Sequence, residues 1–285
     1  MPEYVIILFY KFVALENPEG FRDAQKKLVK ELGMKGRMLV AKEGINGTFE
    51  GTREAITAYQ DALRADSRFS DLKFKESAGT GEAFTKIEIK VRDEVVTLGA
   101  GEFDIKNETA YEMPAEELQA LYESGEDFVV LDLRNDYEIA VGAFENTVHP
   151  NLRNFRELPE KLASIAHLKD KKVVAVCTGG IRCEKATCLL KKEGFTDVSQ
   201  LKDGIHTYMQ KFPAKKFKGS LFVFDNRMTT PVVDAPNREV IGECVFCGAK
   251  SEDFYSDDST RPSTKVICCS ACITSHRANL RNAVA

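Results

Sequence analysis

The sequence predicts an α/β protein made of three successive parts. Predicted strands and helices alternate through most of the chain, and all eight cysteines lie after residue 176. The chain has 285 residues, of which 43% are hydrophobic. That length suits two domains with a small appendage, and the apolar fraction excludes a mainly disordered chain.

The first part, residues 1–98, is predicted to be a two-layer domain. Residues 4–13 are rich in β-branched and aromatic side chains, as expected of a strand. Asn17-Pro18 marks a helix start, and apolar side chains recur at helical spacing until Gly33. Further strands are expected at 37–41, 45–50, 72–75 and within 84–98, with a helix around 55–63. This β-α-β-β-α-β order is typical of a ferredoxin-like (acylphosphatase-like) domain.

The predicted strands at 37–41 and 45–50 enclose a glycine-containing turn region. Asn-Gly is a strong signal for a two-residue hairpin turn, so Asn46-Gly47 is expected to form one. The alternative is that Lys42 and Asn46 face a substrate.

The second part, residues 112–225, follows a linker at 99–112 and is predicted to form a parallel sheet. A helix at 115–123 precedes an apolar strand at 128–132. A second buried strand at 172–176 leads into a helix at about 183–193 and a short strand at 198–201. Strands that alternate with helices favour a parallel sheet with helices on both faces. Active residues then lie at the carboxyl ends of the strands, the position of Cys177.

The segment Cys177-Thr178-Gly179-Gly180-Ile181-Arg182 has the composition of an anion-binding loop. The glycines let the backbone curl so that N–H groups point inward, and the start of the next helix adds a positive end. Arg182 adds a fixed cation with several donors. These effects favour the thiolate, so Cys177 is predicted to be a nucleophile instead of a buried cysteine in an ordinary turn.

At these residues the sequence resembles the rhodanese domain, over about residues 112–220. The Cys-x4-Arg loop has the length typical of that family, one residue shorter than in cysteine phosphatases, and Asp132-Leu133-Arg134 resembles its strand-end Asp-x-Arg segment. The resemblance implies that Cys177 carries sulfur as a persulfide and that Arg182 helps to hold the anion.

A more specific resemblance, over residues 1–225, is to bacterial tRNA uridine hydroxylases of the rhodanese superfamily. It rests on residues 177–186, on residues 42–48 and on Phe155-Arg156. Two turns depart from the usual patterns: Asp203-Gly204-Ile205 replaces the common Gly-Gly-Ile, and Val141-Gly142-Ala143 replaces the Gly-His-Ile of generic rhodaneses.

This resemblance implies oxidation of the wobble uridine, position 34, to 5-hydroxyuridine with molecular oxygen and an unidentified reductant. Cys177 would either add to C6 of uracil or take part as a persulfide or oxidised sulfur. Two alternatives stay open: a thiosulfate-type sulfurtransferase with a cysteine persulfide intermediate, and a non-catalytic tRNA-binding module.

The other two cysteines of this region have different predicted roles. Cys183, at the helix start, either resolves an oxidised Cys177 through a disulfide or only begins the helix. Cys188 lies beside two leucines and is expected to be a small buried apolar residue.

The third part, residues 226–285, carries the remaining five cysteines and is predicted to bind a structural zinc ion. Two Cys-x-x-Cys pairs about twenty residues apart are typical of zinc ribbons. The predicted ligands are Cys244, Cys247, Cys269 and Cys272, with Cys268 and His276 as spare candidates. The alternative is a set of free, reduced cysteines.

Residues 206–227 are locally basic in a chain whose formal net charge is −4. The stretch contains Lys211, Lys215, Lys216, Lys218 and Arg227 against Asp225 alone, with Phe212, Phe217 and Phe222 interleaved. Lysines and stacking aromatic rings are typical of sites that hold single-stranded loops, so this stretch is predicted to bind the tRNA anticodon loop. The alternative is a solvated lysine face over core phenylalanines. By the family pattern, Arg153 and Arg156 are further candidates.

No apolar run reaches the roughly 18 residues of a membrane-spanning helix, and the first residues lack the pattern of an export signal. A cytoplasmic location without membrane contact is therefore expected. In a reducing compartment the cysteines serve metal binding or catalysis more often than disulfide formation. No oligomeric state is predicted.

Overall fold

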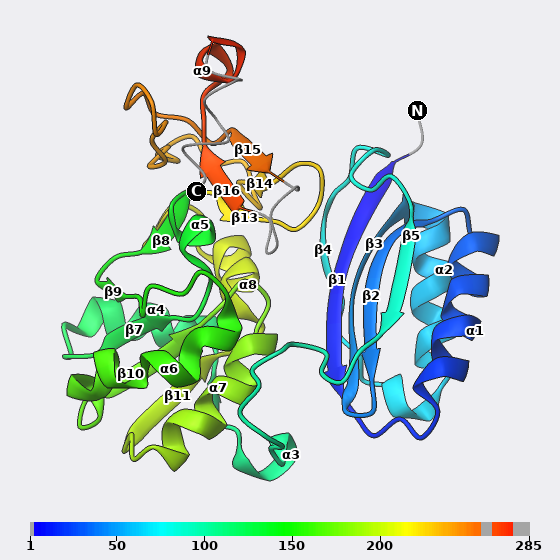
Figure 1. Ribbon diagram of the computed structural model, residues 1–285, viewed down its shortest axis with the longest axis horizontal. Helices are drawn as coiled ribbons and strands as arrows, with labels where there is room; N and C mark the ends of the chain where they lie inside the picture. The colour runs from blue at the N-terminus through cyan, green and yellow to red at the C-terminus, as the bar shows by residue number, and fades with distance from the viewer. Residues whose placement is uncertain (1–2, 258–263, 276–285) are drawn as a thin grey trace. The chain divides into compact units, whose positions relative to one another are not determined.

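The computed structural model describes residues 3–257 and 264–275 (Figure 1). Its contacts divide the chain into two compact units, Met1–Gly99 and Ala100–Ala285, and each unit is described by itself. In the parts of the chain that the structure describes, no helix is long and apolar enough to cross a membrane.

The N-terminal unit is one five-stranded sheet covered on one face by two helices (Figure 1). The strands follow the order β4-β1-β3-β2-β5. Their bounds are β1 Tyr4–Phe12, β2 Lys35–Ala41, β3 Gly44–Thr52, β4 Lys75–Ala78 and β5 Ile87–Val91; the helices are α1 Pro18–Glu31, α2 Arg53–Arg64 and the short 3-10 turn η1 Ser67–Phe69. The first four strands have the predicted ferredoxin-like order, and β5 adds a fifth strand parallel to β2.

Local signals explain where the two helices begin. The side chain of Asn17 accepts a hydrogen bond from the Gly20 N–H, and that of Thr52 accepts one from the Ala55 N–H. Each helix then presents apolar side chains to the sheet, where they join Phe9 and Phe49 of the central strands in one buried core. The helical periodicity of the sequence thus becomes the helix–sheet interface.

The prediction of a turn at Asn46-Gly47 is wrong, because both residues lie inside β3. The hairpin turn consists of residues 42–43, with Ala41 paired to Gly44. A Cβ at Gly44 would lie 2.0 Å from the carbonyl oxygen of Lys11, so only glycine fits there. The Asn46 amide donates to the Val95 carbonyl at 3.0 Å, a long-range contact that local turn propensity does not reveal.

Three other expectations shift at this level. The strand predicted at 72–75 is observed as β4 at 75–78, and the one within 84–98 is limited to β5 at 87–91. The stretch expected to be a linker contains a helix, α3 Ile105–Glu108, and the first strand of the next sheet, β6 Tyr111–Met113.

The second unit contains a parallel five-stranded sheet in the order β6-β11-β10-β7-β9. The strands after β6 are β7 Val129–Asp132, β9 Thr147–Val148, β10 Lys172–Val176 and β11 Asp197–Leu201. The helices around them are α4 Ala115–Ser124, α5 Asp136–Ile139, α6 Leu158–Lys161, α7 Ile181–Lys192 and α8 Gly204–Lys211, with 3-10 turns η2 Phe155–Glu157 and η3 Leu162–Leu168.

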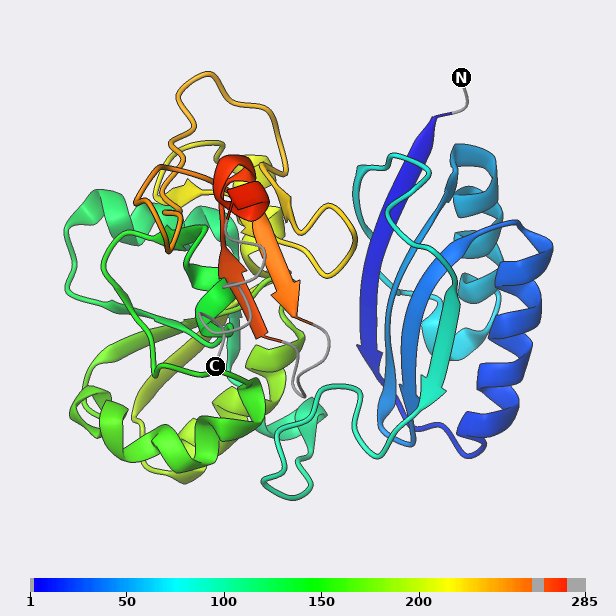
Figure 2. The same cartoon turned by 45° about the horizontal axis from the view of Figure 1, so that its top comes forward.

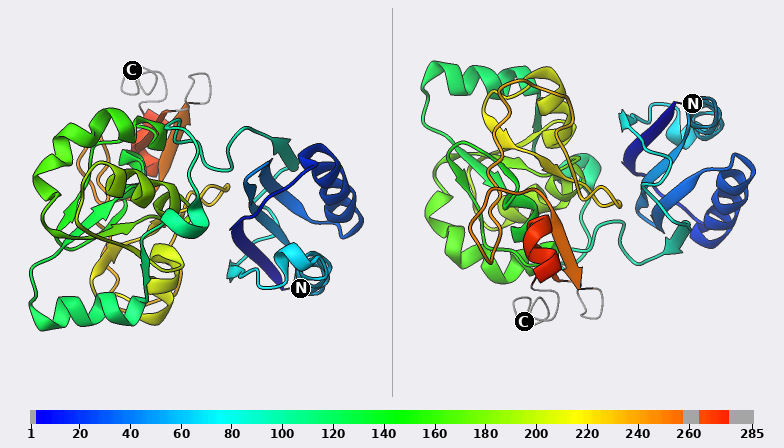
Figure 3. Two further views of the ribbon diagram at one scale, coloured as in Figure 1. Left: turned by 90° about the horizontal axis from the view of Figure 1, so that it is seen from below. Right: turned by 90° about the horizontal axis from the view of Figure 1, so that it is seen from above.

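Helices cover both faces of this parallel sheet, as predicted. In Figure 3 the teal α4 and the yellow α8 lie on one side of the strands and green helices lie on the other. Leu118 of α4 and Tyr208 of α8 belong to one buried cluster with Val174 of β10. Burial on both faces explains why the central strands are continuously apolar in sequence.

The last part of the chain adds small two-stranded sheets to the second unit. These pair β8 Gly142–Phe144 with β12 Phe217–Gly219, β13 Leu221–Phe222 with β14 Thr229–Thr230, and β15 Phe254–Asp257 with β16 Thr264–Ile267; helix α9 Ser270–Ser275 follows. The β15–β16 hairpin and α9 are drawn in orange and red in Figure 2. Ile267 of β16 is buried in a cluster with Val141 and Phe222, so the tail packs directly on the segment around α5.

Candidate active site and cysteine cluster

Cys177 lies directly after β10, the central strand of the parallel sheet. The neighbouring strands β7 and β11 run parallel to β10 on either side. Their carboxyl ends therefore bring the segments after residue 132 and after residue 201 to the same edge. The loop 177–182 is enclosed by two turns that are far away in sequence.

The loop backbone curls around the Cys177 sulfur. Gly180 has a φ of 103°, a conformation that favours glycine, and its N–H donates to the Cys177 Sγ at 3.2 Å. The backbone N–H groups of Arg182 and Cys183 and the Cys183 thiol lie near this sulfur and favour its negative charge. Helix α7 begins at Ile181, two residues earlier than predicted, which places these donors at its first turn.

This environment lowers the pKa of Cys177 to about 6. Burial, with only 1% of the residue exposed, acts in the opposite direction and would raise the pKa. The hydrogen bond from Cys183, the charge of Arg182 and the backbone donors outweigh burial. At neutral pH the Cys177 side chain is therefore a thiolate.

Arg182 is held by a buried carboxylate that the sequence analysis did not identify. Its Nη1 lies 2.8 Å from Glu138 Oε2, and its Nη2 donates to Glu138 Oε1 at 2.9 Å. The Thr178 hydroxyl donates to the same Oε1 at 3.1 Å. Glu138 thus connects two residues of the loop to α5. The sequence signal that could have identified Glu138 was its position in the short helix α5, which follows β7, the strand that pairs with β10.

Asp132 and Arg134, expected from the rhodanese pattern, form a second buried pair. Arg134 Nη2 lies 2.7 Å from Asp132 Oδ2, and neither side chain is exposed. Arg134 Nη2 also donates to the Gly142 carbonyl at 2.7 Å. These contacts tie the end of β7 to β8, so the pair supports the frame around Glu138.

The turn at Asp203-Gly204 holds the other side of the loop. The N–H of Ile205 donates to the Cys177 carbonyl at 3.0 Å, and that of His206 donates to the Thr178 carbonyl at 3.1 Å. A Cβ at Gly204 would lie 2.7 Å from backbone atoms of the loop, so a side chain is excluded there. Asp203 adopts a φ of 61°, which aspartate tolerates better than most residues and which explains why glycine is common at this turn.

The two other cysteines of α7 differ in their contacts. Cys183 is fully buried and hydrogen-bonds Cys177; burial and that neighbour keep its pKa well above the ordinary value. The Cys188 thiol donates instead to the Glu184 carbonyl at 3.1 Å. Cys188 is 1% exposed, in keeping with the expected small buried residue.

The tail brings together the four cysteines predicted as metal ligands, Cys244, Cys247, Cys269 and Cys272. Their sulfur atoms all lie within 4.8 Å of one another, and those of Cys247 and Cys269 are 3.7 Å apart. A tetrahedral ion with sulfur ligands at about 2.3 Å requires sulfur separations of roughly 3.8 Å. The donor set therefore fits a four-coordinate thiophilic metal ion.

Of the two spare candidates, Cys268 does not belong to this group. Cys268 is buried, and its thiol lies 3.8 Å from the Cys269 carbonyl oxygen outside the four-sulfur cluster. His276 lies outside the residues that the structure describes.

Four of the five basic side chains in the stretch 206–227 have an acidic partner. Lys216 and Lys218 lie 2.9 and 3.7 Å from carboxylate oxygens of Glu145. Lys211 lies 2.7 Å from Glu116, and Arg227 pairs with Asp225 at the same distance. Glu116 and Glu145, both distant in the chain, thus halve the local charge of +4 counted from the sequence.

The expectation that Phe217 and Phe222 stack on bases is wrong, because both are buried in the unit's core. Phe212 is half-buried and packs against Tyr208. Among the candidate cations, Arg153, Arg156 and Lys215 are exposed and form no ion pair within the described ranges.

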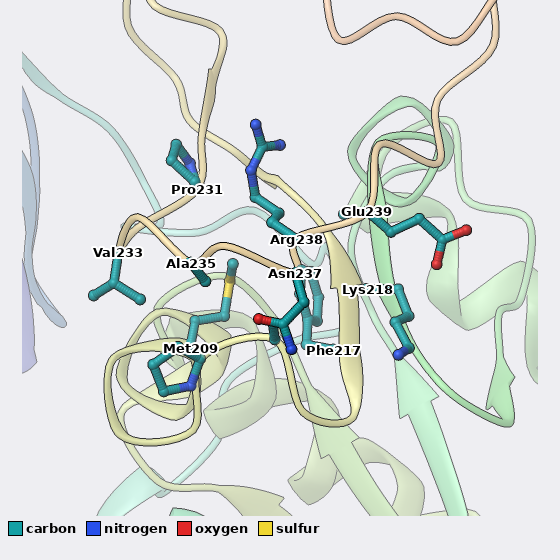
Figure 4. A pocket seen from close by; sticks show the side chains of 12 residues that line it. Met209, Phe217, Lys218, Pro231, Val233, Ala235, Asn237, Arg238 and Glu239 are labelled. Carbon is teal, nitrogen blue, oxygen red and sulfur yellow. The ribbon is translucent and has the colours of Figure 1, made fainter.

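A pocket at the end of α8 lies away from this chemistry. Met209, Phe217 and parts of the segment 231–239 line it (Figure 4), whereas no residue of the loop 177–182 does. Its Arg238 is bound to Glu252 at 2.6 Å and to the Ser220 hydroxyl at 2.8 Å. That guanidinium is therefore already engaged within the tail.

Comparison with known proteins assigns the chain's parts to known families. Residues 4–95 match the UPF0176 acylphosphatase like domain, residues 114–211 the Rhodanese-like domain and residues 218–282 the Rhodanase C-terminal domain. The first two matches agree with the observed folds of the corresponding segments.

Several curated relatives named tRNA uridine(34) hydroxylase cover almost the whole chain. One from Onion yellows phytoplasma (strain OY-M) is 41% identical, covering 93% of this chain and 87% of its own length. One from Bacillus licheniformis is 40% identical, with 93% and 83% covered. One from Cytophaga hutchinsonii is 37% identical, with 95% and 86% covered. At this identity and coverage, the chain belongs to the tRNA uridine(34) hydroxylase family.

Proposed function

We propose that this chain hydroxylates the wobble uridine of tRNA, at position 34, to 5-hydroxyuridine with molecular oxygen. The observation that carries the proposal is the thiolate of Cys177, held by backbone N–H groups at the carboxyl edge of a parallel sheet. Relatives that are 40–41% identical over most of their length carry the name tRNA uridine(34) hydroxylase.

Cys177 is the proposed nucleophile, and Arg182 with the backbone of Thr178, Gly179, Gly180 and Ile181 holds it as an anion. Addition of the sulfur to C6 of uracil would make C5 electron-rich enough to react with an oxygen species. An oxidised or persulfidated sulfur that takes part directly is the alternative route. Both routes need a nucleophilic sulfur at neutral pH, which the lowered pKa of Cys177 provides.

The proposed tRNA contacts are basic side chains, of which Arg153 and Arg156 are exposed near this edge of the sheet. Arg153 and Arg156 follow β9, which runs parallel to β7, so they come after a carboxyl end at the same edge as Cys177. Exposed cations without ion pairs can neutralise phosphates without first breaking a protein contact. Lys211, Lys215, Lys216 and Lys218 complete the proposed surface for the anticodon loop, and all but Lys215 must exchange a carboxylate for a phosphate.

We further propose a three-part organisation, with a tRNA-positioning domain at 1–98, the catalytic domain at 112–225 and a metal-bound tail at 226–285. Zinc is the proposed ion, because four thiolates in a closed tetrahedral set are typical of structural zinc sites. When bound, the ion would hold the tail fold together without entering the reaction. A tRNA substrate and reduced thiols both suit a cytoplasmic location.

The test is nucleoside mass spectrometry of tRNA from a strain that lacks the gene, with the gene restored as wild type, Cys177→Ala or Cys188→Ala. Wild type and Cys188→Ala should restore 5-hydroxyuridine, and Cys177→Ala should not. Full 5-hydroxyuridine with Cys177→Ala would refute the catalytic role of this cysteine.

The sulfurtransferase alternative is separated by a second measurement on the same proteins. A persulfide enzyme would convert thiosulfate and cyanide to thiocyanate without tRNA. A non-catalytic module would bind tRNA equally well as Cys177→Ala and leave its nucleosides unchanged.

A further inference from the structure

Cys177 and Cys183 are two buried cysteines of one curled loop, with 1% and 0% of the residue exposed. Gly180 connects them: its N–H donates to the Cys177 Sγ at 3.2 Å, and its carbonyl accepts from the Cys183 N–H at 3.0 Å. The Cys183 thiol is close enough to affect the pKa of Cys177, whereas the other cysteine of α7, Cys188, donates to a backbone carbonyl. Cys183 is therefore placed to react with the Cys177 sulfur.

Hydroxylation by molecular oxygen needs two electrons that uridine does not supply. One oxygen atom enters at C5, and the other must leave as water, which requires two electrons and two protons. In the loop 177–183, whose residues the structure describes throughout, the two thiols are the only side chains that can be oxidised reversibly.

We propose that Cys177 and Cys183 supply these two electrons and end each turnover as a disulfide. The inference rests on the proposed function and names the electron source that the reaction needs.

The bond changes balance step by step. Cys177 adds to C6 of uracil, and the electron-rich C5 bonds dioxygen as a peroxide. Transfer of the C5 proton to the peroxide restores the C5–C6 double bond and breaks the S–C6 bond, which returns Cys177 as a thiolate. The terminal peroxide oxygen then passes to this thiolate: the O–O bond breaks, an S–O bond forms, and C5 keeps the other oxygen, which takes up a proton from solvent as a hydroxyl. Cys183 then attacks the Cys177 sulfenic sulfur: an S–S bond forms, the S–O bond breaks, and hydroxide leaves with the Cys183 proton as water. In total, uridine, dioxygen and two thiols become 5-hydroxyuridine, a disulfide and water.

The contacts of the pair suit this order of events. Cys183 needs to reach only Cys177, not the substrate, and its buried position next to Cys177 allows that. Burial and the neighbouring Cys177 thiolate together raise the pKa of Cys183 and keep it protonated in the resting state. Formation of the neutral sulfenic acid removes the negative charge of Cys177, which makes it easier for Cys183 to lose its proton as it attacks.

The scheme also specifies the chemical class of the reductant. A disulfide is returned to two thiols by thiol–disulfide exchange, so a dithiol, either a small molecule or a protein, should sustain turnover. An electron donor that cannot exchange with disulfides should not sustain turnover.

The experiment is a single turnover of the full-length protein. The protein is reduced, freed of reductant without oxygen and mixed with tRNA from a strain lacking the gene, and oxygen is then admitted. After acid quenching and alkylation, peptide mass spectrometry quantifies the Cys177–Cys183 disulfide and nucleoside mass spectrometry quantifies 5-hydroxyuridine. We expect about one disulfide per 5-hydroxyuridine, followed by arrest until dithiothreitol is added.

Two variants sharpen the result. Cys188→Ser should behave as wild type, because Cys188 does not contact Cys177. Cys183→Ser should leave Cys177 as a sulfenic acid that a dimedone reagent traps, with no disulfide.

Formation of 5-hydroxyuridine while both thiols stay reduced would overturn the inference and leave the proposed function standing. Absence of 5-hydroxyuridine even with dithiothreitol would overturn the proposed function and this inference with it.

Discussion

Replacing Glu138 by glutamine should destabilise the second unit far more than an ordinary charge removal. The carboxylate contacts Arg182 at 2.8 and 2.9 Å, and the two side chains are 0% and 9% exposed. Water therefore screens the pair little, and Glu138→Gln leaves the buried guanidinium with the Cys177 thiolate as its remaining anionic neighbour. Breaking such a pair from one side costs about 3–5 kcal/mol in the free energy of unfolding.

Urea unfolding followed by far-UV circular dichroism measures this loss, since the chain has no tryptophan for fluorescence. Lys211→Gln is the matched control, because Lys211 and Glu116 lie 2.7 Å apart but are 46% and 58% exposed. That surface pair should be worth less than about 1 kcal/mol.

The double variant Glu138→Gln/Arg182→Gln tests the physical cause. Removing both charges leaves no buried guanidinium, and the nearby Cys177 thiolate can become neutral by taking up a proton, so the double variant should recover most of the stability lost in Glu138→Gln. Either of two results would contradict this explanation. One is that Glu138→Gln lowers the free energy of unfolding no more than Lys211→Gln does. The other is that the double variant lowers it by the sum of the losses measured for Glu138→Gln and Arg182→Gln separately.

Three further predictions concern the thiols and their supports. The alkylation rate of Cys177 should reach half its maximum near pH 6, because its pKa is about 6, and should fall about tenfold per pH unit below that value as the thiolate is protonated; an inflection near pH 9 would contradict the described environment. Gly204→Ala should move this inflection to higher pH, because the added Cβ would lie 2.7 Å from the loop backbone. Gly194→Ala is the control and should leave the inflection in place: Gly194 also has a positive φ, but the nearest atom to its added Cβ is 3.9 Å away. In elemental analysis Cys244→Ser should lose the tail's metal ion and Cys268→Ser should retain it, since Cys244 belongs to the four-sulfur group and Cys268 does not. Equal metal contents in the two variants would count against that ligand set.

The tail has a contact path to the active-site loop within the second unit. Phe222 packs against Tyr137 of α5 at 5.0 Å between ring centres and against Phe254 of the tail at 5.2 Å. Phe224 lies 5.7 Å from the Arg182 guanidinium. The tail thus supports the helix that carries Glu138, which gives a structural reason for a metal-stabilised appendage on this fold.

Short-range patterns in the sequence predicted the parts of the site that depend on neighbours in the chain. The Cys177 loop follows an apolar strand and precedes a helix, and the two Cys-x-x-Cys pairs come together as expected. These features depend on backbone geometry within a few residues, which glycine, cysteine and apolar spacing encode directly.

The same kind of pattern misled where distant contacts decide the outcome. Asn46-Gly47 has the composition of a turn, yet both residues pair on two sides within β3, and the Asn46 amide bonds to Val95. Phe217 and Phe222 stand among basic residues in the sequence, yet burial of their rings in the core outweighs the polarity of their neighbours.

The sequence by itself determined the α/β class, the position of the reactive cysteine at a strand end and the four thiols of the tail, because each depends on local periodicity and spacing. Only the tertiary structure decided that Glu138 would hold Arg182 and that Gly204 would support the loop. Both roles follow from the strand order β11-β10-β7, which places two turns beside Cys177 from segments far apart in the chain. Strand order is set by packing of the whole sheet, and no local pattern specifies it.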